Sequence, residues 1–592
     1  MDFRRLFDIL PYQQARFAQQ VALSHKKGIR RQSFSTEACL VEINRVSAGL
    51  RQLNLKKGDR VGIMTYNGSP QWNFLDLGMQ QIGIVSVPIH ASLHAQQLVD
   101  LIKDAGLKAC VVANRELHEK VVQVQRQTPS LQHLFVLEDS PDLPGWSDIT
   151  TTPSSEDLET IQAFKAAIHE DDLATIIYTS GTTGGLKGVM LSHKNLVSNI
   201  KATLALVPLN ASKRTVSFLP MSHIFERMVV FTYMAAGASV YYLNRQGDIA
   251  QQIKEVRPHF FSSVPRILEK VYEGIISNAN SRSKLLQKVI FWAIALGKKY
   301  KESKRMSPAY WWKWMVADFL VYRHWRRLLG NKIEGMVVGA AALNPELGRL
   351  FAAAGFEPRE GYGMTETSPV IAFNRFEPGG VRYGTVGPPL PGVQIKIDPL
   401  DGEEEGEILV KGPNVMMGYY QNEAATQTIF NEEGWLHTGD VGRIVHKHFL
   451  QITGRKKDIF KTSSGKYVVP QKLEVLLKSS TLIEQVIIIG FNRPFVSALI
   501  VPCFVILKQW CEKHNIHWTA PQFMVLNNRV VDHYQNIVEE FNSLLYSHEQ
   551  IKKFQLLYLP WTEEDGSLTP TLKPKRDIIT NRHEKEISIL YS

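Results

Sequence analysis

Short apolar runs alternate with amphipathic segments along the first third of the chain. The runs at 58–67, 84–91 and 109–114 predict buried strands. The segments between them, 74–83 and 98–106, carry apolar residues at helical spacing and predict helices. Strands that alternate with helices in this way are typical of parallel βαβ units, so the pattern predicts an α/β fold.

The pattern changes twice in the second half. Glycine and proline become frequent after Gly379 and separate short alternating runs, which predicts a smaller β-rich sub-domain. A charged connector then follows Arg455, with a predicted helix at 471–477 and an apolar strand at 486–490. We therefore expect a large N-terminal domain, 1–455, and a small α+β domain, 456–592.

One apolar window, 228–243, could suggest a membrane segment. It is shorter than the roughly 20 residues that a bilayer span needs, and it is interrupted by Thr232, Gly237 and Ser239. The window therefore predicts buried strands in a protein without a membrane span.

The composition is that of a large folded protein. Its 592 residues include 44% hydrophobic and 21% charged residues, values that exclude a disordered, collagen-like or coiled-coil chain. The four cysteines lack CxxC spacing, so the sequence indicates neither a disulfide framework nor a zinc site. These features, with no visible export signal, predict a cytoplasmic enzyme. The sequence does not indicate an oligomeric state.

The net charge of +11 is concentrated in one segment. Ten basic and two acidic residues lie between Lys298 and Lys332, and the region around them, a predicted helical insertion at about 278–332, holds five of the eleven tryptophans. Basic helices with aromatic residues suit an anionic membrane surface, which predicts peripheral membrane contact on the inner face. The alternative is a packed insertion with a solvated basic rim. No recognition motif accompanies the charge, so nucleic-acid binding is not expected.

A loop rich in Gly, Ser and Thr, TSGTTGGLKG at 179–188, follows an apolar strand predicted at 174–178. Backbone N–H groups, hydroxyls and Lys187 in such a loop suit a phosphate. The Walker A pattern does not fit, because Leu186, Lys187 and Gly188 stand where Gly, Lys and Ser or Thr are required. The loop alone is weak support for a nucleotide site.

Further motifs follow in order: GYGMTE at 361–366, GWLHTGD at 434–440, TGRKKD at 453–458 and LTPTLKPKR at 568–576. Together with the loop at 179–188 they resemble the signature set of the adenylate-forming superfamily, which includes acyl-CoA synthetases, luciferases and peptide-synthetase adenylation domains. LPMSHIFER at 219–227 and VRPHFFSSVPRILEKVYEGI at 256–275 are similar to the long-chain fatty acid members, including the bubblegum type.

The resemblance implies a role for each motif. The ATP or AMP ligands would be Thr179, Ser180, Gly181, Thr182, Thr183, Gly184, Lys187, Gly339, Ala340, Ala341, Gly361, Tyr362, Gly363, Met364, Asp440 and Arg455. Lys573, Glu366, Thr365 and His223 would be catalytic, and Glu366 with Thr182 would hold Mg²⁺, which prefers oxygen ligands. Taken singly, each has an ordinary structural alternative; His223, for example, could be a satisfied core histidine.

The implied activity is that of a long-chain fatty acid:CoA ligase that forms AMP. The partners would be a fatty acid, ATP and CoA, with Mg²⁺ as cofactor. The small domain would be mobile and rotate about Lys457, and Lys461 and Gly465 would lie on the CoA side. The alternatives are another adenylate former, for a medium-chain or aryl acid, and a catalytically inactive fatty-acid-binding or membrane scaffold.

The sequence departs from the family pattern at three places. Leu186 stands where many members have Pro, and Ala340 stands where long-chain members usually have a second Gly. Thr571 and Leu572 before Lys573 replace the widespread Ser and Gly. None of these changes removes a charged group that the chemistry requires.

Overall fold

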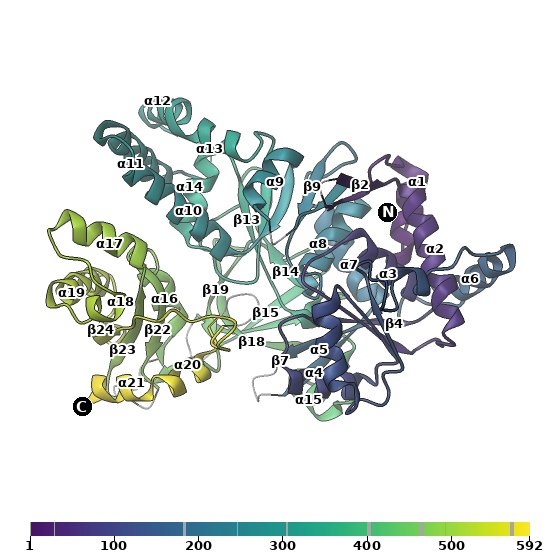
Figure 1. The fold of residues 1–592 in the computed structure, drawn as a ribbon. Coiled ribbons are helices and arrows are strands. Elements are labelled where there is room, and N and C mark those ends of the chain that lie inside the picture. Colours follow the sequence, from purple (N-terminus) through teal and green to yellow (C-terminus); the bar gives the residue numbers. More distant parts are fainter. Residues whose placement is uncertain are drawn as a thin grey trace.

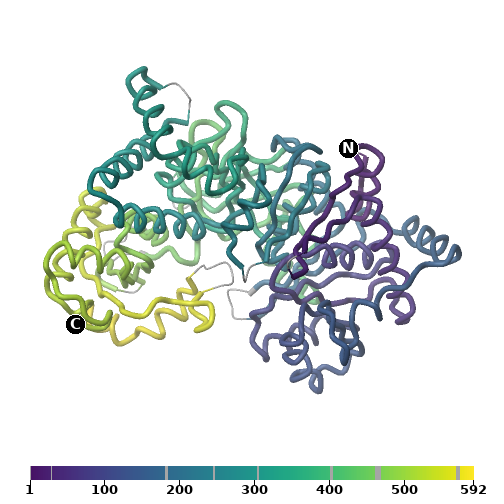
Figure 2. Tube along the Cα trace, turned by 45° about the horizontal axis from the view of Figure 1, so that its top comes forward, coloured from purple at the N-terminus to yellow at the C-terminus, as the bar shows by residue number. Residues whose placement is uncertain are grey.

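The computed structural model describes residues 2–28, 30–180, 185–244, 247–302, 306–399, 404–461, 467–491, 493–568 and 574–592, and for 180, 461 and 467 the backbone alone. A large body is built from the first three quarters of the chain, and the C-terminal segment forms a smaller unit beside it (Figures 1 and 2). The predicted α/β fold is confirmed.

One sheet of the large body contains the predicted βαβ units. Its seven described strands run in the order β17 (Gly418–Tyr419), β8 (Leu186–Ser192), β7 (Leu173–Ser180), β4 (Val85–His90), β3 (Arg60–Thr65), β5 (Ala109–Val112) and β6 (His133–Val136). Strands β3 to β6 pair in parallel through crossover helices α3 (Pro70–Gln80), α4 (Ala95–Ala105) and α5 (Arg115–Gln125).

A second sheet lies beside the first. Its eight described strands run in the order β14 (Val370–Phe373), β13 (Pro358–Gly363), β12 (Gly335–Val338), β11 (Phe260–Ser263), β9 (Arg214–Ser217), β10 (Ser239–Tyr242), β1 (Leu23–Lys27) and β2 (Arg30–Phe34). The six strands from β13 to β1 are parallel to one another, and the edge strands β14 and β2 are antiparallel to them.

The remaining helices and turns of the large body connect or cover these sheets. They are η1 (Leu6–Asp8), α1 (Ile9–Phe17), α2 (Thr36–Gln52), η2 (Trp146–Ile149), α6 (Ser155–Ala167), α7 (His193–Leu204), α8 (Ile224–Ala235), α9 (Ile249–Val256), α14 (Pro345–Ala353), η4 (Thr365–Thr367) and α15 (Glu423–Ile429).

The prediction of buried strands at 228–243 was wrong for its first half. Residues up to Ala235 belong to helix α8, and only Ser239–Tyr242 form a strand, β10. Nearly every residue of α8 is buried, so its apolar residues show no one-sided helical period. In the described part of the chain no helix is both long and apolar enough to cross a membrane.

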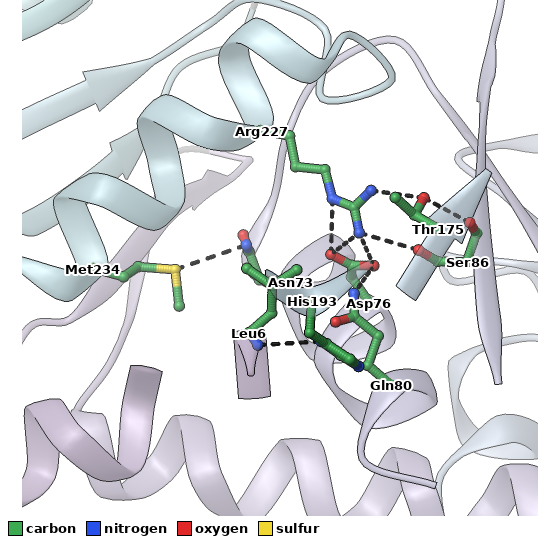
Figure 3. A network of polar contacts seen from close by, with 9 residues as sticks. All are labelled: Leu6, Asn73, Asp76, Gln80, Ser86, Thr175, His193, Arg227 and Met234. Atoms are coloured by element: carbon green, nitrogen blue, oxygen red, sulfur yellow. Dashed lines mark hydrogen bonds and ion pairs between the residues drawn. The ribbon is translucent and has the colours of Figure 1, made fainter. Parts of the chain in front are cut away.

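Helix α8 is bonded to the first sheet by a buried ion pair. Arg227 donates from Nη2 to Asp76 Oδ1 of α3 at 2.7 Å, and both side chains are almost fully buried (Figure 3). Arg227 also donates to the hydroxyls of Ser86 on β4 and Thr175 on β7 (Figure 3). Every polar edge of the guanidinium therefore faces a partner, as a buried charge requires.

The predicted β-rich sub-domain is a sheet of four described strands in the order β15 (Gln394–Pro399), β16 (Gly406–Lys411), β18 (Leu436–Val445) and β19 (Phe449–Arg455). All three pairs are antiparallel. Strand β19 also contacts the large body, because its residue Leu450 forms a bridge with Gly387.

The C-terminal unit is an α+β fold. Strands β22 (Ile483–Ile489), β23 (Val496–Pro502) and β24 (Ile551–Leu556) form its sheet, and β20 (Phe460–Lys461) pairs with β21 (Tyr467–Val468). Its helices are α16 (Pro470–Leu477), α17 (Phe504–Lys513), α18 (Pro521–Met524), α19 (Asn528–Asn542), α20 (Arg576–Arg582) and α21 (Glu584–Tyr591).

The predicted insertion is helical. The predicted range, about 278–332, holds α11 (Lys284–Lys298), α12 (Pro308–Ala317), the π-helical turn η3 (Asp318–Tyr322) and α13 (Arg323–Leu328), and the preceding helix α10 (Pro265–Asn280) extends into its start. Figure 1 shows α11 and α12 at an outer corner of the molecule, away from the sheets.

Candidate functional site

A cleft of about 3540 Å³ opens where the large body, the four-stranded sheet and the C-terminal unit meet. Its walls include β7, β13, β18 and α16, so residues far apart in sequence face one space. Fifteen of the residues predicted for the site line it: Thr179, Lys187, His223, Gly339, Ala340, Ala341, Gly361, Tyr362, Gly363, Met364, Thr365, Glu366, Asp440, Arg455 and Lys457.

The other predicted residues are placed in part or not at all. Gly181, Thr182, Thr183 and Gly184 lie outside the described residues, as do Gly465 and Lys573. Ser180 and Lys461 are described only by their backbones, in strands β7 and β20.

The Gly-rich segment connects two antiparallel strands. Thr179, near the end of β7, pairs with Lys187 of β8. Both residues were expected to lie in the loop 179–188. This differs from the strand-to-helix loop of a P-loop protein, in agreement with the failed Walker A match. The Lys187 ammonium lies 4.9 Å from the centroid of the Tyr419 ring, so a cation is held at the cleft wall.

Strand β13 and turn η4 place Glu366 in the cleft. Glu366 is 8% exposed, and its Oε1 accepts a hydrogen bond from the Tyr419 hydroxyl at 2.8 Å. Burial raises the pKa of Glu366 above its usual value. The preceding Gly363 is required by packing, because a Cβ there would lie 1.9 Å from the carbonyl oxygen of Pro369.

Strands β18 and β19 place Asp440 opposite Arg455. The Arg455 Nε lies 3.2 Å from Asp440 Oδ1, and the Tyr362 hydroxyl donates to Asp440 Oδ2 at 2.8 Å. Burial and the adjacent Asp440 raise the pKa of Tyr362 well above its usual value, so Tyr362 stays a neutral donor. Three motifs thus meet at one carboxylate.

Glu407 of β16 supports this cluster and had no motif to mark it. Its carboxylate accepts from Lys456 Nζ at 2.7 Å and from the Gly439 backbone N–H at 3.1 Å, and it lies 3.0 Å from His437. Burial alone would raise the pKa of Glu407, but Lys456 and His437 outweigh it and lower the pKa. The charged carboxylate therefore bonds both to strand β18, next to Asp440, and to the turn after β19.

The strip Gly339–Ala341 follows β12 and forms another part of the wall. Ala340 has φ +70°, a left-handed conformation that favours glycine, so the departure noted in the sequence costs backbone strain. Two residues after the strip, the Leu343 backbone N–H donates to the Glu360 carboxylate at 2.9 Å. Burial raises the pKa of Glu360 to about 8.

His223 is the N-cap residue of α8. Its ring centroid lies 5.0 Å from that of His90, at the end of β4, and both imidazoles line the cleft. Phe225, two residues on, packs against the strip, since a Cβ on Gly339 would lie 3.1 Å from its ring. The LPMSHIFER motif therefore contributes both to the cleft wall and, through Arg227, to the core.

An apolar arm of the cleft extends beyond this polar cluster into the insertion side of the large body. Sequence patterns did not identify it, because its residues come from five elements, α9, β11, α10, β12 and α14, and from the loops after β9, α13 and α14. Its lining residues include Phe218, Ile253, Phe261, Leu268, Leu329, Met336, Phe351 and Phe356.

Glu366 is a single carboxylate, not part of a preformed metal cage. The described residues contain no group of three His, Cys, Asp or Glu side chains that could hold a metal ion. Mg²⁺ is commonly held by one or two carboxylates together with substrate phosphates and water. A buried carboxylate that lines the cleft fits that mode of binding.

The Asp440 cluster leads to a prediction about nucleotide affinity. Asp440→Ala should weaken AMP binding by roughly 1–3 kcal/mol if the carboxylate accepts from ribose hydroxyls. Isothermal titration calorimetry with AMP measures this, and Asp398→Ala, an exposed aspartate on β15 of the same sheet, is the matched control. Equal AMP affinity in the two variants would exclude Asp440 from the nucleotide site.

Comparisons with known proteins agree with this arrangement. The model of the AMP-binding enzyme family matches residues 10–420, and that of the AMP-binding enzyme C-terminal domain matches 457–592. The long-chain-fatty-acid–CoA ligase FadD15 of Mycobacterium bovis is 32% identical over 93% of this chain and 91% of its own length. Long-chain-fatty-acid–CoA ligase 6 of Mus musculus is 31% identical over 92% of this chain and 80% of its own length.

Among solved structures, the adenylation domain of a carboxylate reductase from Mycobacterium chelonae has the same fold. Its TM-score is 0.76 at 21% identity, with 99% of this chain and 91% of that chain covered. The family models, the relatives and the fold lead to one conclusion: the chain belongs to the AMP-binding, adenylate-forming ligases of the acyl-CoA synthetase family.

Proposed function

We propose that this ligase activates a long-chain fatty acid and transfers it to CoA. The observation that carries the proposal is the continuity of the cleft: the polar cluster of Tyr362, Glu366 and Asp440 opens into an apolar arm within the large body. A nucleotide and an aliphatic chain could occupy the two parts together. Two relatives that match over most of this chain are named as long-chain-fatty-acid–CoA ligases.

The first half-reaction joins the acid to AMP. A carboxylate oxygen of the fatty acid attacks the α-phosphorus of ATP, the bond to the bridging oxygen breaks, and pyrophosphate leaves. Thr179, Lys187 and the segment 181–184 would bind the β- and γ-phosphates, and Thr365 the α-phosphate. Mg²⁺, held by Glu366 with Thr182, would supply positive charge to the phosphates. Such a reaction depends mainly on positioning and charge neutralisation.

The nucleoside would be held by the rest of the cleft wall. Asp440 would accept from the ribose hydroxyls, and Arg455 would keep the carboxylate in place. The face of Tyr362 and the backbone of Gly339–Ala341 would contact the adenine, with Gly361 and Met364 beside them. His223 would border the carboxyl end of the acyl chain.

The second half-reaction transfers the acyl group. The CoA sulfur attacks the acyl carbonyl carbon, its proton is lost to solvent, and AMP leaves with the electrons of the broken acyl–phosphate bond. We infer two domains, 1–455 and 456–592, that rotate about Lys457 between the steps, with Lys461 and Gly465 on the CoA side and Lys573 withdrawn. Gating by domain rotation is a common device in enzymes with two reactions in one site.

The hinge assignment predicts a variant that separates the two steps. Lys457 lies in the exposed turn after β19. Lys457→Pro fixes φ near −65° and restricts the preceding residue, so we expect adenylate formation to persist while thioester formation falls. Lys457→Ala, which keeps backbone freedom, is the control. Equal loss of both half-reactions in folded Lys457→Pro protein would argue against a hinge there.

A substrate panel tests the proposed function. AMP formation with ATP and CoA should be fastest, as kcat/KM, with palmitate and much slower with hexanoate or benzoate, since only a long chain fills the apolar arm. Preference for hexanoate or benzoate would overturn the long-chain assignment. Binding of palmitate without any AMP formation would instead favour a fatty-acid-binding scaffold.

A further inference from the structure

We propose that the exposed face of α12 and η3 docks on an anionic lipid bilayer. The face consists of Trp311, Trp312, Met315, Val316, Phe319 and Leu320, here named the apolar crest. These six side chains are between 38% and 63% exposed, far more than large apolar residues of a packed helix. The crest is the solvent-facing part of the insertion that Figure 1 places at an outer corner.

The crest lies on one side of the helix and is fixed there. Its residues are spaced i, i+1, i+4, i+5, i+8 and i+9, which is one face of a helical segment. On the opposite side, Trp314 donates from its indole N–H to the Ala353 carbonyl at 2.9 Å, and the Tyr322 hydroxyl donates to the Ala293 carbonyl at 2.6 Å. These bonds prevent the crest from rotating into the core.

The charge around the crest selects an anionic partner. The described residues 306–332 contain one acid, Asp318, and five basic residues: Lys313, Arg323, Arg326, Arg327 and Lys332. Asp318 is paired with Arg326 at 2.6 Å. The Arg323 guanidinium carbon lies 3.7 Å from the centroid of the Phe319 ring. Aromatic rings that enter the interface while Lys and Arg meet headgroups are typical of peripheral membrane binding.

Other occupants fit this surface less well. A second copy of the chain would bring the basic residues around two crests together, and like charges oppose that contact. A nucleic acid would satisfy the cations but leave the six apolar side chains without an apolar partner. A bilayer with anionic headgroups satisfies both features at once.

The helical insertion that carries the crest also contributes to the apolar arm of the cleft. Leu328 at the end of α13 is 64% exposed, and the next residue, Leu329, lines the cleft. Docking through the crest would therefore place the apolar arm close to the membrane, where a poorly soluble acid is concentrated. The advantage of access to a membrane-bound acid rests on the proposed function, whereas binding of the crest to the bilayer does not.

Sedimentation with vesicles tests the proposal without any substrate. Wild-type protein should bind phosphatidylcholine vesicles that contain phosphatidylglycerol at low salt, bind pure phosphatidylcholine weakly, and dissociate as salt screens the charges. The double variant Trp312→Ser with Phe319→Ser should lose about tenfold or more in affinity, because two apolar side chains no longer leave water. The triple variant Lys313→Gln, Arg327→Gln and Lys332→Gln should lose about tenfold at low salt.

The matched control is Phe523→Ser with Leu526→Ser, two comparably exposed apolar residues of the C-terminal unit. It should bind as wild type does. Absence of binding to anionic vesicles at low salt, or equal binding by the crest variants and the control, would overturn the proposal, as would a crest-dependent dimer in size-exclusion chromatography. AMP formation with dissolved fatty acid is measured separately, so failure of membrane docking and failure of the proposed function give different results.

Discussion

Lys573→Ala should abolish most adenylate formation and leave thioester formation from supplied acyl-adenylate and CoA nearly unchanged. The proposed role of Lys573 is to neutralise charge that develops around the α-phosphorus, which occurs only in the first half-reaction. Loss of one preorganised donor to a developing charge lowers kcat on the order of 10²–10³-fold. Lys573 lies outside the described residues, but the residues that flank the segment 569–573, Leu568 and Pro574, both line the cleft and form a bridge with each other.

Single-turnover assays of the two half-reactions measure this split. Lys585→Ala, an exposed lysine on α21, is the matched control and should leave both steps unchanged. A Lys573→Ala protein that is folded and equally slow in both half-reactions would contradict the role assigned to Lys573. Full activity in both would remove Lys573 from the mechanism.

Asp76→Asn should strongly destabilise the large body. The substitution keeps the shape of the side chain at position 76, but it leaves the buried Arg227 guanidinium without its counter-charge (Figure 3). Breaking one partner of a buried pair costs about 3–5 kcal/mol of unfolding free energy. Urea denaturation followed by tryptophan fluorescence measures the loss.

The control for this prediction is Asp139→Asn. The Lys27–Asp139 pair has a similar distance, 2.6 Å, but its side chains are 64% and 77% exposed. An exposed pair contributes no more than about 1 kcal/mol. Replacement of both buried partners, Asp76→Leu with Arg227→Met, should cost less than Asp76→Asn alone, because no charge is left unpaired. Equal effects of Asp76→Asn and Asp139→Asn would show that the buried network does not hold α8 to the first sheet.

Features with a local sequence signal could be predicted, and features that depend on tertiary packing could not. Helix α4 was predicted correctly because its buried residues, such as Leu98, Leu101 and Ile102, repeat at helical spacing, and Gly106 ends it in a left-handed conformation. Helix α8 was mistaken for strand because it is buried on all sides and has no polar face. Burial on all sides depends on tertiary packing, which periodicity does not report.

The residues of the candidate site also divide into those with a local sequence motif and those without one. Tyr362, Asp440 and Arg455 stand in contiguous motifs, so their residue types and order were visible before the structure joined them. Glu407 was missed because its partners His437 and Lys456 are 30 and 49 positions away, and no motif surrounds it. The apolar arm was missed for a stronger reason: a cavity is a property of elements placed together in space, and its lining residues resemble any other core.

The central claim is that the chain first makes an acyl-adenylate, and palmitate-dependent exchange between labelled pyrophosphate and ATP in the absence of CoA tests it most directly. We expect exchange that requires palmitate and Mg²⁺, and that falls with Asp440→Ala and Lys573→Ala but not with Asp398→Ala or Lys585→Ala. Palmitate binding without exchange, or exchange that does not depend on a carboxylic acid, would contradict the account.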